Sequence, residues 1–570
     1  MSTSSSKCTT ALLSLGFVFL AGTAPGCSAT SDAMGGAGTG GTKESSVGAG
    51  GAAGEVGFGG GIGGSNTSDI VPQTCDEAVR EKSYIGCEYW PTVTSNSLVY
   101  SGFEYAIALA NPTKSNSDVT VERNGVVVAT STVASGDLQT LKLPWVPELK
   151  YAEGNDVTSV LLPGGGYKVS SSVPVTMYQF NPLEFQLASN PPDCPHLADF
   201  GACFSFTNDA SILLPTTALR GEYYVMSYPA QHAYSFHDSA WVNSMGFVAI
   251  TATANETKVK FTSTAHVRVG SGVGSLSPGQ TGTYTLQAGD VLMLMTDGPP
   301  NQETSQPDEP CVNDPLVGMI LCPTAPEYDL TGSHIEADKP VSVIGGHDCS
   351  FVPYDRAACD HLEESLFPVE ALGKDLIVTA PKSVLGSTSD KPDSMYVRVL
   401  SAADNNYIEF SPAVGTPGTL NAGHWVEIGP VAKDFRIMAT NKILVGQYMV
   451  GENFTGVSVG GGDPSLSIAI PTDQYRSSYT FLAPSTYTQS VVNVVAPTGA
   501  TIELDGQAIP AAEFSTIGTS GMSVARHQIF GGAHAISSDK KFGIVVYGYG
   551  SYTSYMYPGG LNLETIIVPH

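Results

Sequence analysis

Positive charge is scarce in this sequence. Its 26 lysines and arginines stand against 53 aspartates and glutamates, which gives a formal net charge of −27 over 570 residues. A nucleic-acid groove or a basic membrane-binding face needs clustered lysine and arginine, so the composition argues against both. Solubility is the ordinary explanation of such an acidic surface.

The sequence also lacks the short motifs of several enzyme classes. It has no His-Glu-x-x-His, no Gly-x-x-x-x-Gly-Lys-Ser/Thr, and no Gly-x-Gly-x-x-Gly between a strand and a helix. One Gly-x-Ser-x-Gly surrounds Ser458, but Gly461, Gly462 and Pro464 follow where a nucleophile elbow needs a helix. We expect no catalytic residues and no cofactor, although a dispersed pair of carboxylates would leave no motif.

Helical periodicity is absent beyond two turns, whereas strand patterns are frequent. Apolar or alternating runs bounded by turn residues occur at residues 105–109, 247–253, 291–295 and 544–547. Asn124-Gly125 and Asp505-Gly506 have the composition of type I′ hairpin turns. These patterns predict an all-β protein.

Cysteines are few but closely grouped. After Cys27, eight cysteines form four close neighbours in sequence: Cys75 with Cys87, Cys194 with Cys203, Cys311 with Cys322, and Cys349 with Cys359. Sequential pairing closes the shortest loops, and each such bridge stabilises the fold by about 3 kcal/mol in chain-entropy terms. We expect four local disulfides in an oxidising compartment, with buried free thiols as the alternative.

The N-terminal region has the features of an export signal. Lys7 precedes an apolar run at residues 11–24 that is too short to span a membrane, and small residues lead directly to Cys27. We interpret residues 1–26 as a signal peptide and Cys27 as the lipidated first residue of a lipoprotein, with plain secretion as the alternative. Residues 27–73 are rich in Gly, Ala, Ser and Thr, which predicts a flexible tether.

Internal repetition organises the rest of the chain. A polar segment before an apolar strand recurs at intervals of about 100 residues in the second half, and we expect each segment to be a turn that closes a unit. These segments lie around Pro174, Pro340, Ile443 and Phe542. The clusters that open the units contain Tyr105, Tyr223, Leu376 and Tyr479. The pattern predicts tandem, degenerate β-sandwich-like units packed in a compact array, at residues 74–210, 211–360, 361–462 and 463–570; a β-propeller is the alternative.

One junction between units carries a family resemblance. The segment Gly346-His347-Asp348-Cys349, followed by Cys359-Asp360-His361-Leu362-Glu363-Glu364 and Leu366-Phe367-Pro368, resembles the IgGFc-binding protein N-terminal domain family. The resemblance covers about residues 89–451 and extends more weakly to the end of the chain. It implies an extracellular binding or adhesion module without catalysis, of the kind found in mucus-associated animal proteins and exported bacterial proteins. Immunoglobulin Fc binding belongs to an animal member and is not carried over.

The same junction contains two histidines and two aspartates in a mirrored order. His347-Asp348-Cys349 and Cys359-Asp360-His361 mirror each other, so in an antiparallel pair His347 would lie opposite His361 and Asp348 opposite Asp360, with Glu363 nearby. We name these five as possible binding residues. Two imidazoles at one level could ligate zinc, but hydrogen bonding to loop backbone is the expected role, and no metal is assigned.

These patterns together predict a cell-surface lipoprotein that displays an all-β binding body on a flexible stalk. Ser28, directly after Cys27, resembles the sorting pattern of outer-membrane lipoproteins. The expected partners are the membrane, through the lipid anchor, and a surface protein or polysaccharide. The tyrosine-rich residues 547–555 suit either ligand contact or packing between units. An exported carbohydrate-active or other hydrolase and a structural envelope component are the alternative functions.

Overall fold

The computed structural model describes residues 69–152, 157–195, 197, 201–301, 310–315, 317–384, 391–457 and 460–563. Within these residues the regular structure is almost entirely β-strand, and the strands pair antiparallel. The expected all-β fold of sandwich-like units is confirmed. The expected signal peptide, Cys27, almost all of the expected tether and Ser458 lie outside the described residues. No helix in the described part of the chain is long and apolar enough to cross a membrane.

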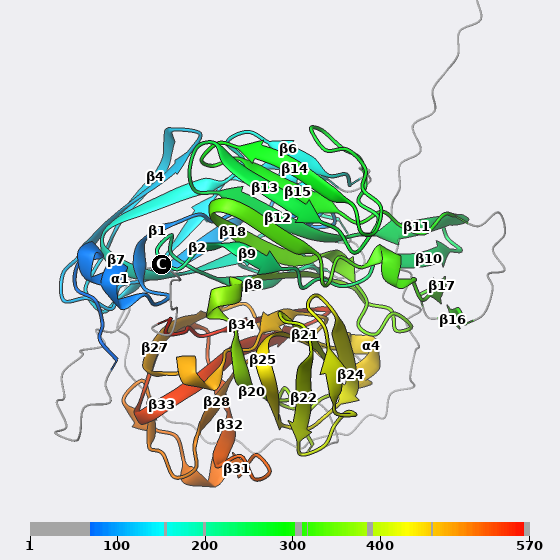
Figure 1. The fold of residues 1–570 in the computed structure, drawn as a ribbon. Coiled ribbons are helices and arrows are strands. Elements are labelled where there is room, and N and C mark those ends of the chain that lie inside the picture. Colours follow the sequence, from blue (N-terminus) through cyan, green and yellow to red (C-terminus); the bar gives the residue numbers. More distant parts are fainter. Residues whose placement is uncertain are drawn as a thin grey trace, which may run out of the picture.

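Four units with one strand topology follow one another along the chain (Figure 1). In each unit a single long strand pairs with four others, namely the first, second, third and last strands of that unit. We call the first of these the opening strand and the last the closing strand. Two strands pair one after the other along each edge of the long strand. The long strand therefore passes through both sheets of its sandwich.

The first two units occupy the first two thirds of the chain. The first unit contains β1 (Gly86–Tyr89), β2 (Tyr105–Ala110), β3 (Ser117–Arg123), β4 (Val126–Val133), β5 (Leu138–Leu143), the long strand β7 (Tyr167–Asn181) and β8 (Asp209–Leu213), with helices α1 (Cys75–Glu81) and α2 (Pro147–Lys150). The second contains β9 (Arg220–Tyr224), β12 (Gly246–Ala252), β13 (Thr257–Thr262), β14 (Thr281–Leu286), β15 (Val291–Met295), the 3-10 turn η1 (Pro326–Tyr328), the long strand β18 (His334–Ser350) and β19 (Asp360–Ser365). Strand β6 (Val160–Leu162) precedes β7 in sequence but pairs with β15, and so joins the two units.

The last two units repeat this arrangement. The third contains η2 (Val369–Ala371), β20 (Gly373–Val378), β21 (Met395–Ser401), β22 (Asn406–Ser411), β23 (Gly418–Leu420), β24 (Trp425–Val431), the long strand β25 (Phe435–Met449), α4 (Glu452–Thr455) and β26 (Leu466–Ile468). The fourth contains η3 (Thr472–Gln474), β27 (Arg476–Ala483), β28 (Gln489–Pro497), β29 (Ile502–Leu504), β30 (Gln507–Ala508), η4 (Ala511–Glu513), β31 (Ser515–Thr516), β32 (Met522–Ile529), the long strand β33 (Gly532–Gly550) and β34 (Thr553–Pro558).

Each long strand changes its burial pattern halfway along. β18 alternates between buried and exposed positions at first and is fully buried from Val341 to Ser350, and the other long strands switch similarly. The pairing with the opening strand shifts register near this switch. The predicted closing turns are therefore wrong. The polar residues mark a bulged bend where one continuous strand passes from a half-exposed sheet into the buried centre.

Tyrosines on the opening strands bind the long strands. The hydroxyls of Tyr89, Tyr223 and Tyr479 donate to main-chain oxygens of Val175, Val341 and Phe542, respectively. The first opening position was predicted one strand too late, because Tyr105 begins β2 and Tyr89 occupies the equivalent site. The predicted hairpin turns are confirmed: Asn124, Gly125, Asp505 and Gly506 all have the positive φ that type I′ turns require.

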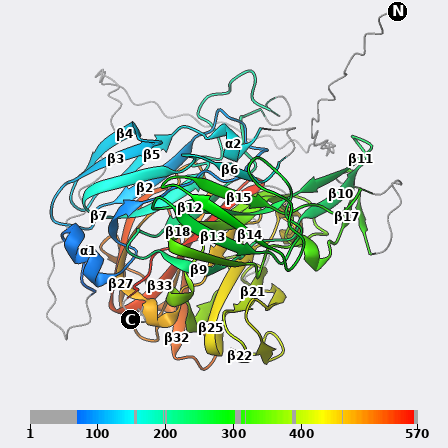
Figure 2. The same cartoon turned by 45° about the horizontal axis from the view of Figure 1, so that its top comes forward.

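The four closing strands meet at the centre of the molecule. β8 contacts β19 and β34, and β26 contacts the same two strands, so that the closing strands form a closed ring in the order of their units. Figure 1 shows the first two units (blue to green) above the last two (yellow to red), and the turned view in Figure 2 shows the same grouping. Every unit therefore packs against the others at the centre, and the predicted compact array is confirmed.

A small additional sheet, which we call the arm, projects from the second unit (Figures 1 and 2). It contains β10 (Gln231–Ser235), β11 (Ala240–Ser244), β16 (Val312–Asp314) and β17 (Met319–Cys322), in the order β11-β10-β17-β16. The three other units have no such sheet in the part of the chain that the structure describes.

A buried arginine joins the second and third units. The guanidinium of Arg398, on β21, donates to Asp329 Oδ2 at 2.7 Å, Thr331 Oγ1 at 2.8 Å and the main-chain oxygen of Ser227 at 3.0 Å, all in the second unit. It also stacks on Trp425, 4.3 Å from the ring centroid. A planar cation with several donors is well suited to such a site, since it satisfies many acceptors at once.

Arg398→Lys should therefore destabilise the protein by about 2–4 kcal/mol, because a lysine leaves buried acceptors of the second unit unpaired. Urea unfolding measures the loss. Arg436→Lys is the matched control, since the ion pair of Arg436 with Asp375 is partly exposed and its loss should cost less than about 1 kcal/mol. Equal losses in the two variants would contradict this role for Arg398.

Candidate functional site

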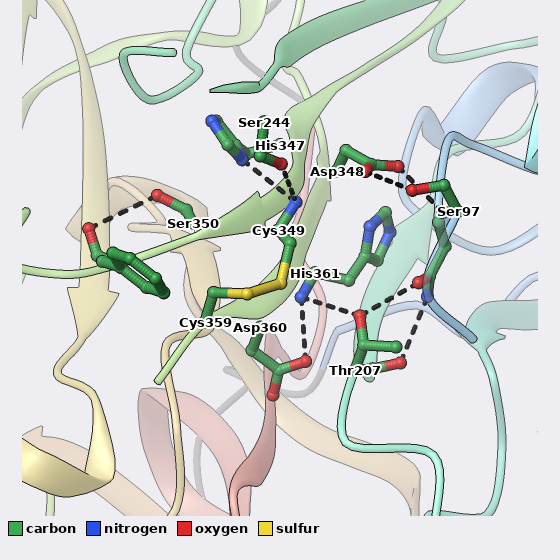
Figure 3. The surroundings of a disulfide bond; sticks show 12 residues. Ser97, Thr207, Ser244, His347, Asp348, Cys349, Ser350, Cys359, Asp360 and His361 are labelled. Atoms are coloured by element: carbon green, nitrogen blue, oxygen red, sulfur yellow. Dashed lines mark hydrogen bonds between the residues drawn. A yellow bond between two sulfur atoms is a disulfide. The ribbon is translucent and has the colours of Figure 1, made fainter. Parts of the chain in front are cut away.

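Four disulfides join the cysteine pairs predicted from their spacing: Cys75–Cys87, Cys194–Cys203, Cys311–Cys322 and Cys349–Cys359. The last connects the end of β18 with the residue before β19 and therefore lies beside the ring of closing strands. Figure 3 shows this bridge with four of the five predicted binding residues around it. Disulfides of this kind persist in oxidising, extracytoplasmic compartments.

The mirrored register predicted at this bridge is wrong. His347 lies opposite Leu362, and Asp360 lies opposite Ser350. A register shift between His347 and Ser350 removes the two histidines and the two aspartates from the cross-strand positions that the mirrored sequence suggested. A bulge of this kind cannot be read from the order of the residues, because tertiary packing fixes it.

All five predicted binding residues are buried. The exposed fraction is 3% for Asp348 and 0% for His347, Asp360, His361 and Glu363. Their side chains contact other parts of the protein instead of solvent. Among the described residues, no group of three or more His, Cys, Asp or Glu side chains is placed to hold a metal ion.

His347 is a neutral, hydrogen-bonded core residue. Its Nε2 lies 3.1 Å from the main-chain oxygen of Pro229, and its Nδ1 lies 3.1 Å from the main-chain nitrogen of Cys349. The second contact requires Nδ1 to accept, so Nε2 carries the proton and donates to Pro229. Burial lowers the pKa of His347 to about 3, which keeps the ring uncharged at physiological pH.

Asp348 joins the second unit to a segment of the first. Its Oδ1 accepts hydrogen bonds from Ser95 Oγ at 2.6 Å and from the main-chain nitrogen of Ser97 at 2.9 Å, and its Oδ2 accepts from Ser97 Oγ at 2.6 Å. Figure 3 shows the contact with Ser97. A buried carboxyl is tolerated where donors surround it in this way.

Glu363 occupies the centre of a second polar cluster. Its Oε1 accepts from Gln179 Nε2 at 3.0 Å, and its Oε2 accepts from Thr94 Oγ1 at 2.6 Å. His361 Nε2 lies 3.4 Å from the same Oε2, and Asn181 also reaches it. Glu363 and His361 belong to the second unit and the other three residues to the first, so the cluster crosses the boundary between the two units.

Asp360 connects the second unit to the first and the fourth. Its Oδ1 accepts from the main-chain nitrogens of Asn208 and His361, and its Oδ2 accepts from the main-chain nitrogen of Ser554 at 2.9 Å. Burial, and then the nearby carboxyl of Asp463, raise the pKa of Asp360 well above its usual value.

Asp209, at the start of β8, connects all four closing strands, and the sequence did not single it out. Its carboxyl is fully buried and accepts five hydrogen bonds, one of them from its own neighbour Ala210. The other donors are Ser465 Oγ and the main-chain nitrogens of Met556, Glu363 and Leu466, from the fourth, second and third units. Burial raises the pKa of Asp209, and the hydrogen bonds oppose that rise.

Another buried acidic pair lies between the third and fourth units. Glu452, in α4, accepts hydrogen bonds at Oε2 from the main-chain nitrogens of Tyr552 and Gly461, at 2.9 and 3.2 Å. Its own nitrogen donates to Asp463 Oδ1 at 3.0 Å. Burial raises the pKa of Glu452 to about 7, so this carboxyl titrates near neutral pH.

The tyrosine-rich segment at residues 547–555 packs between units and does not form a contact surface. Tyr547, Tyr549 and Tyr555 are 1–2% exposed. The hydroxyl of Tyr547 donates to Asn493 Oδ1 at 2.7 Å, and that of Tyr549 donates to the main-chain oxygen of Lys382 at 2.9 Å. The second of the two predicted roles is therefore confirmed.

Aromatic residues gather on the arm, where His232 and Trp241 are buried and Phe236 is exposed. The rings of His232 and Trp241 stack with centroids 4.4 Å apart, and Tyr234 meets Trp241 edge-on at 5.5 Å. Phe236, in the β10–β11 turn, packs edge-on against Tyr234 and is 48% exposed. Its nitrogen donates to the main-chain oxygen of Gly318, directly before β17, at 3.0 Å. The spacing of these aromatic residues in sequence gave no signal that distinguished them from core residues.

A family model described as IgGFc binding protein matches residues 209–548, from the first residue of β8 to near the end of β33. The match begins later than the resemblance predicted at residue 89 and extends well past residue 451. It includes the arm and the Cys349–Cys359 junction. No curated protein matches the chain.

The raised pKa of Glu452 predicts a pH-dependent stability. Because the folded-state pKa of about 7 exceeds the usual value of 4.5, the folded protein favours the protonated form, and stability falls as pH rises from about 4.5 through 7. Glu452→Gln keeps an acceptor and cannot ionise. Its free energy of unfolding relative to wild type should therefore rise across this range, by roughly 2–3 kcal/mol.

Urea unfolding at pH 5, 6, 7 and 8 measures this difference. Glu409→Gln, at an exposed position of β22, is the matched control and should follow the wild-type profile. A constant difference between Glu452→Gln and wild type at all four values would show that the carboxyl is not held protonated by burial.

Proposed function

The chain belongs to the IgGFc-binding protein family, and from that membership we propose that it is a lipid-anchored, non-catalytic adhesion protein of a bacterial outer surface. The family supports a binding function. The anchor, the location and the nature of the ligand are the parts that we propose. The ligand is a protein or polysaccharide of another surface.

Export and anchoring are supported by two independent features. The four disulfides fit an oxidising compartment. The apolar run before Cys27 and the Gly-rich residues after it have the composition of a lipoprotein signal and a tether. A Gly-rich coil of this length has a root-mean-square reach of roughly 35–40 Å, which would hold the folded body clear of the membrane.

The arm of the second unit is the feature that most directly supports a binding function. All four units are built to one plan, and among the described residues only the second adds a projecting sheet. The Cys311–Cys322 disulfide and the stacked aromatic rings make that sheet rigid. Rigid aromatic side chains supply contact area at a low cost in conformational entropy, and residues such as Phe236 remain accessible.

A non-catalytic role is supported by the structural contacts of the acidic and imidazole groups at the junction. Asp348 and Asp360, from the segments that had the composition of a reactive site, bind neighbouring units, and His347 is hydrogen-bonded within its own unit. Their hydrogen-bonding capacity serves assembly of the ring, and the ligand-binding surface is left to the arm and the loops beside it.

Cell attachment tests the proposal. Cells of a Gram-negative host that express the full chain should attach to a layer of cells lacking it several times more often than cells expressing Cys27→Ser, which cannot be acylated. Treating the cell layer with protease or with periodate, which oxidises the vicinal diols of sugars, assigns the ligand to protein or polysaccharide. Equal attachment by both strains, with the wild-type chain shown to be surface-exposed, would overturn the adhesion function.

A further inference from the structure

A shallow cavity of about 390 Å³, open to solvent, lies at the foot of the arm. Its size falls within the range of small-molecule sites. Its lining includes Asn243, His266, Asp297, Pro299, Asn301 and Tyr328. They come from β11, from the loops that follow β13 and β15, and from η1, all within the second unit.

Main-chain hydrogen bonds fix the walls of this cavity. The nitrogen of Asp297 donates to the main-chain oxygen of His266 at 2.8 Å, and the nitrogen of His266 donates to that of Glu327 at 2.8 Å. The oxygen of Tyr328 accepts from the nitrogen of Ala230, directly before β10, at 2.9 Å. The cavity is therefore formed before any ligand arrives and is joined to the arm, which lowers the entropic cost of binding.

Several polar groups in the cavity have unused hydrogen-bonding capacity. Across the described residues, the ring nitrogens of His266, the hydroxyl of Tyr328 and the side-chain amide of Asn301 have no hydrogen-bond partner in the protein. Asp297 uses only one carboxylate oxygen, Oδ1, which accepts from the nitrogen of Gly298 at 3.0 Å. The cavity thus offers both donors and acceptors, a combination that matches hydroxyl groups better than it matches a pure cation or anion.

An aromatic wall completes the site. The rings of Tyr328 and His266 lie with centroids 5.5 Å apart, and the Tyr328 ring packs against the apolar core of the first two units. Partial burial, and then the carboxylates of Glu327 and Asp297, raise the pKa of Tyr328, so its hydroxyl keeps its proton near neutral pH. Pro299 adds apolar surface nearby. A fixed aromatic face beside donors and acceptors suits a pyranose ring, which has apolar C–H faces and a rim of hydroxyls.

We propose that this cavity binds one neutral sugar residue of a surface glycan, with a C–H face of the sugar against Tyr328 and its hydroxyls on Asp297, His266 and Asn301. The proposal rests on the binding function above and names its ligand class. The arm contacts the remainder of the same glycan, since Asn243 connects the two places. Its Oδ1 lies 2.6 Å from Nδ1 of His232, which stacks on Trp241, and its side chain lines the cavity.

Saturation-transfer NMR on the full chain tests the site with four probes: the methyl glycosides of glucose, galactose, mannose and N-acetylglucosamine. At least one should bind the wild type in the millimolar range. Tyr328→Ala and Asp297→Asn should each weaken that binding at least tenfold. Tyr407→Ala is the matched control, because Tyr407 is exposed on β22 in the third unit and should leave binding unchanged.

The outcomes separate this inference from the proposed function. Absence of signal from all four glycosides, or full binding by both cavity variants, overturns the sugar site. Preferential binding of N-acetyl-lysinamide, a cationic probe that Asp297 could attract, also overturns it. Cell attachment that survives periodate but not protease leaves the adhesion function standing and rejects the sugar ligand. Glycoside binding by a chain that attaches to no cells supports the cavity and rejects adhesion.

Discussion

The carboxyl group of Asp209 is the interaction on which this architecture depends. It lies in a ring of four closing strands, each from a different unit, and it accepts hydrogen bonds from the second, third and fourth units as well as from its own strand. A buried carboxyl without donors would be costly, but this one satisfies main-chain N–H groups that would otherwise be unpaired. The hydrogen bonds of this one side chain thus stabilise the packing of all four units against one another.

The sequence segment that carries the family resemblance contributes to the contacts between units. Asp348 and Asp360, on either side of the disulfide, each bind main-chain nitrogens of another unit, and Glu363 binds side chains of the first unit. The segment therefore specifies how units assemble. The arm and the cavity beside it lie on the same unit but outside the ring. The arm also contacts the junction, since the nitrogen of Cys349 donates to Ser244 Oγ of β11.

Features fixed by short stretches of chain were predictable from the sequence. The Asn124-Gly125 turn depends on adjacent residues, the four disulfides join cysteines 9 to 12 positions apart, and the strand patterns depend on local alternation. The long strands were not predicted, because a polar stretch within a strand and a polar turn have the same composition. Only the burial of the second half of β18 against other units shows that the strand continues.

The centre of the candidate site was missed for a related reason. Asp209 begins a short, ordinary strand, and its partners Ser465 and Met556 lie hundreds of residues away. Nothing in the neighbouring sequence indicates that these groups meet. The register between β18 and β19 likewise depends on a bulge that packing imposes, so the mirrored histidines led to a wrong pairing. The cavity at the foot of the arm gathers Asn243, His266, residues 297–301 and Tyr328 from four segments, none of which forms a motif.

The stability of an Asp209→Asn variant tests the central claim most directly. The substitution keeps the shape of the side chain but places an NH₂ group against buried donors, so the free energy of unfolding should fall by at least about 3 kcal/mol. Asp118→Asn, the same change at an exposed position of β3, should alter it by less than about 0.5 kcal/mol. Equal, small effects of the two substitutions in urea unfolding would contradict the account, because they would show that the ring holds together without the Asp209 carboxyl.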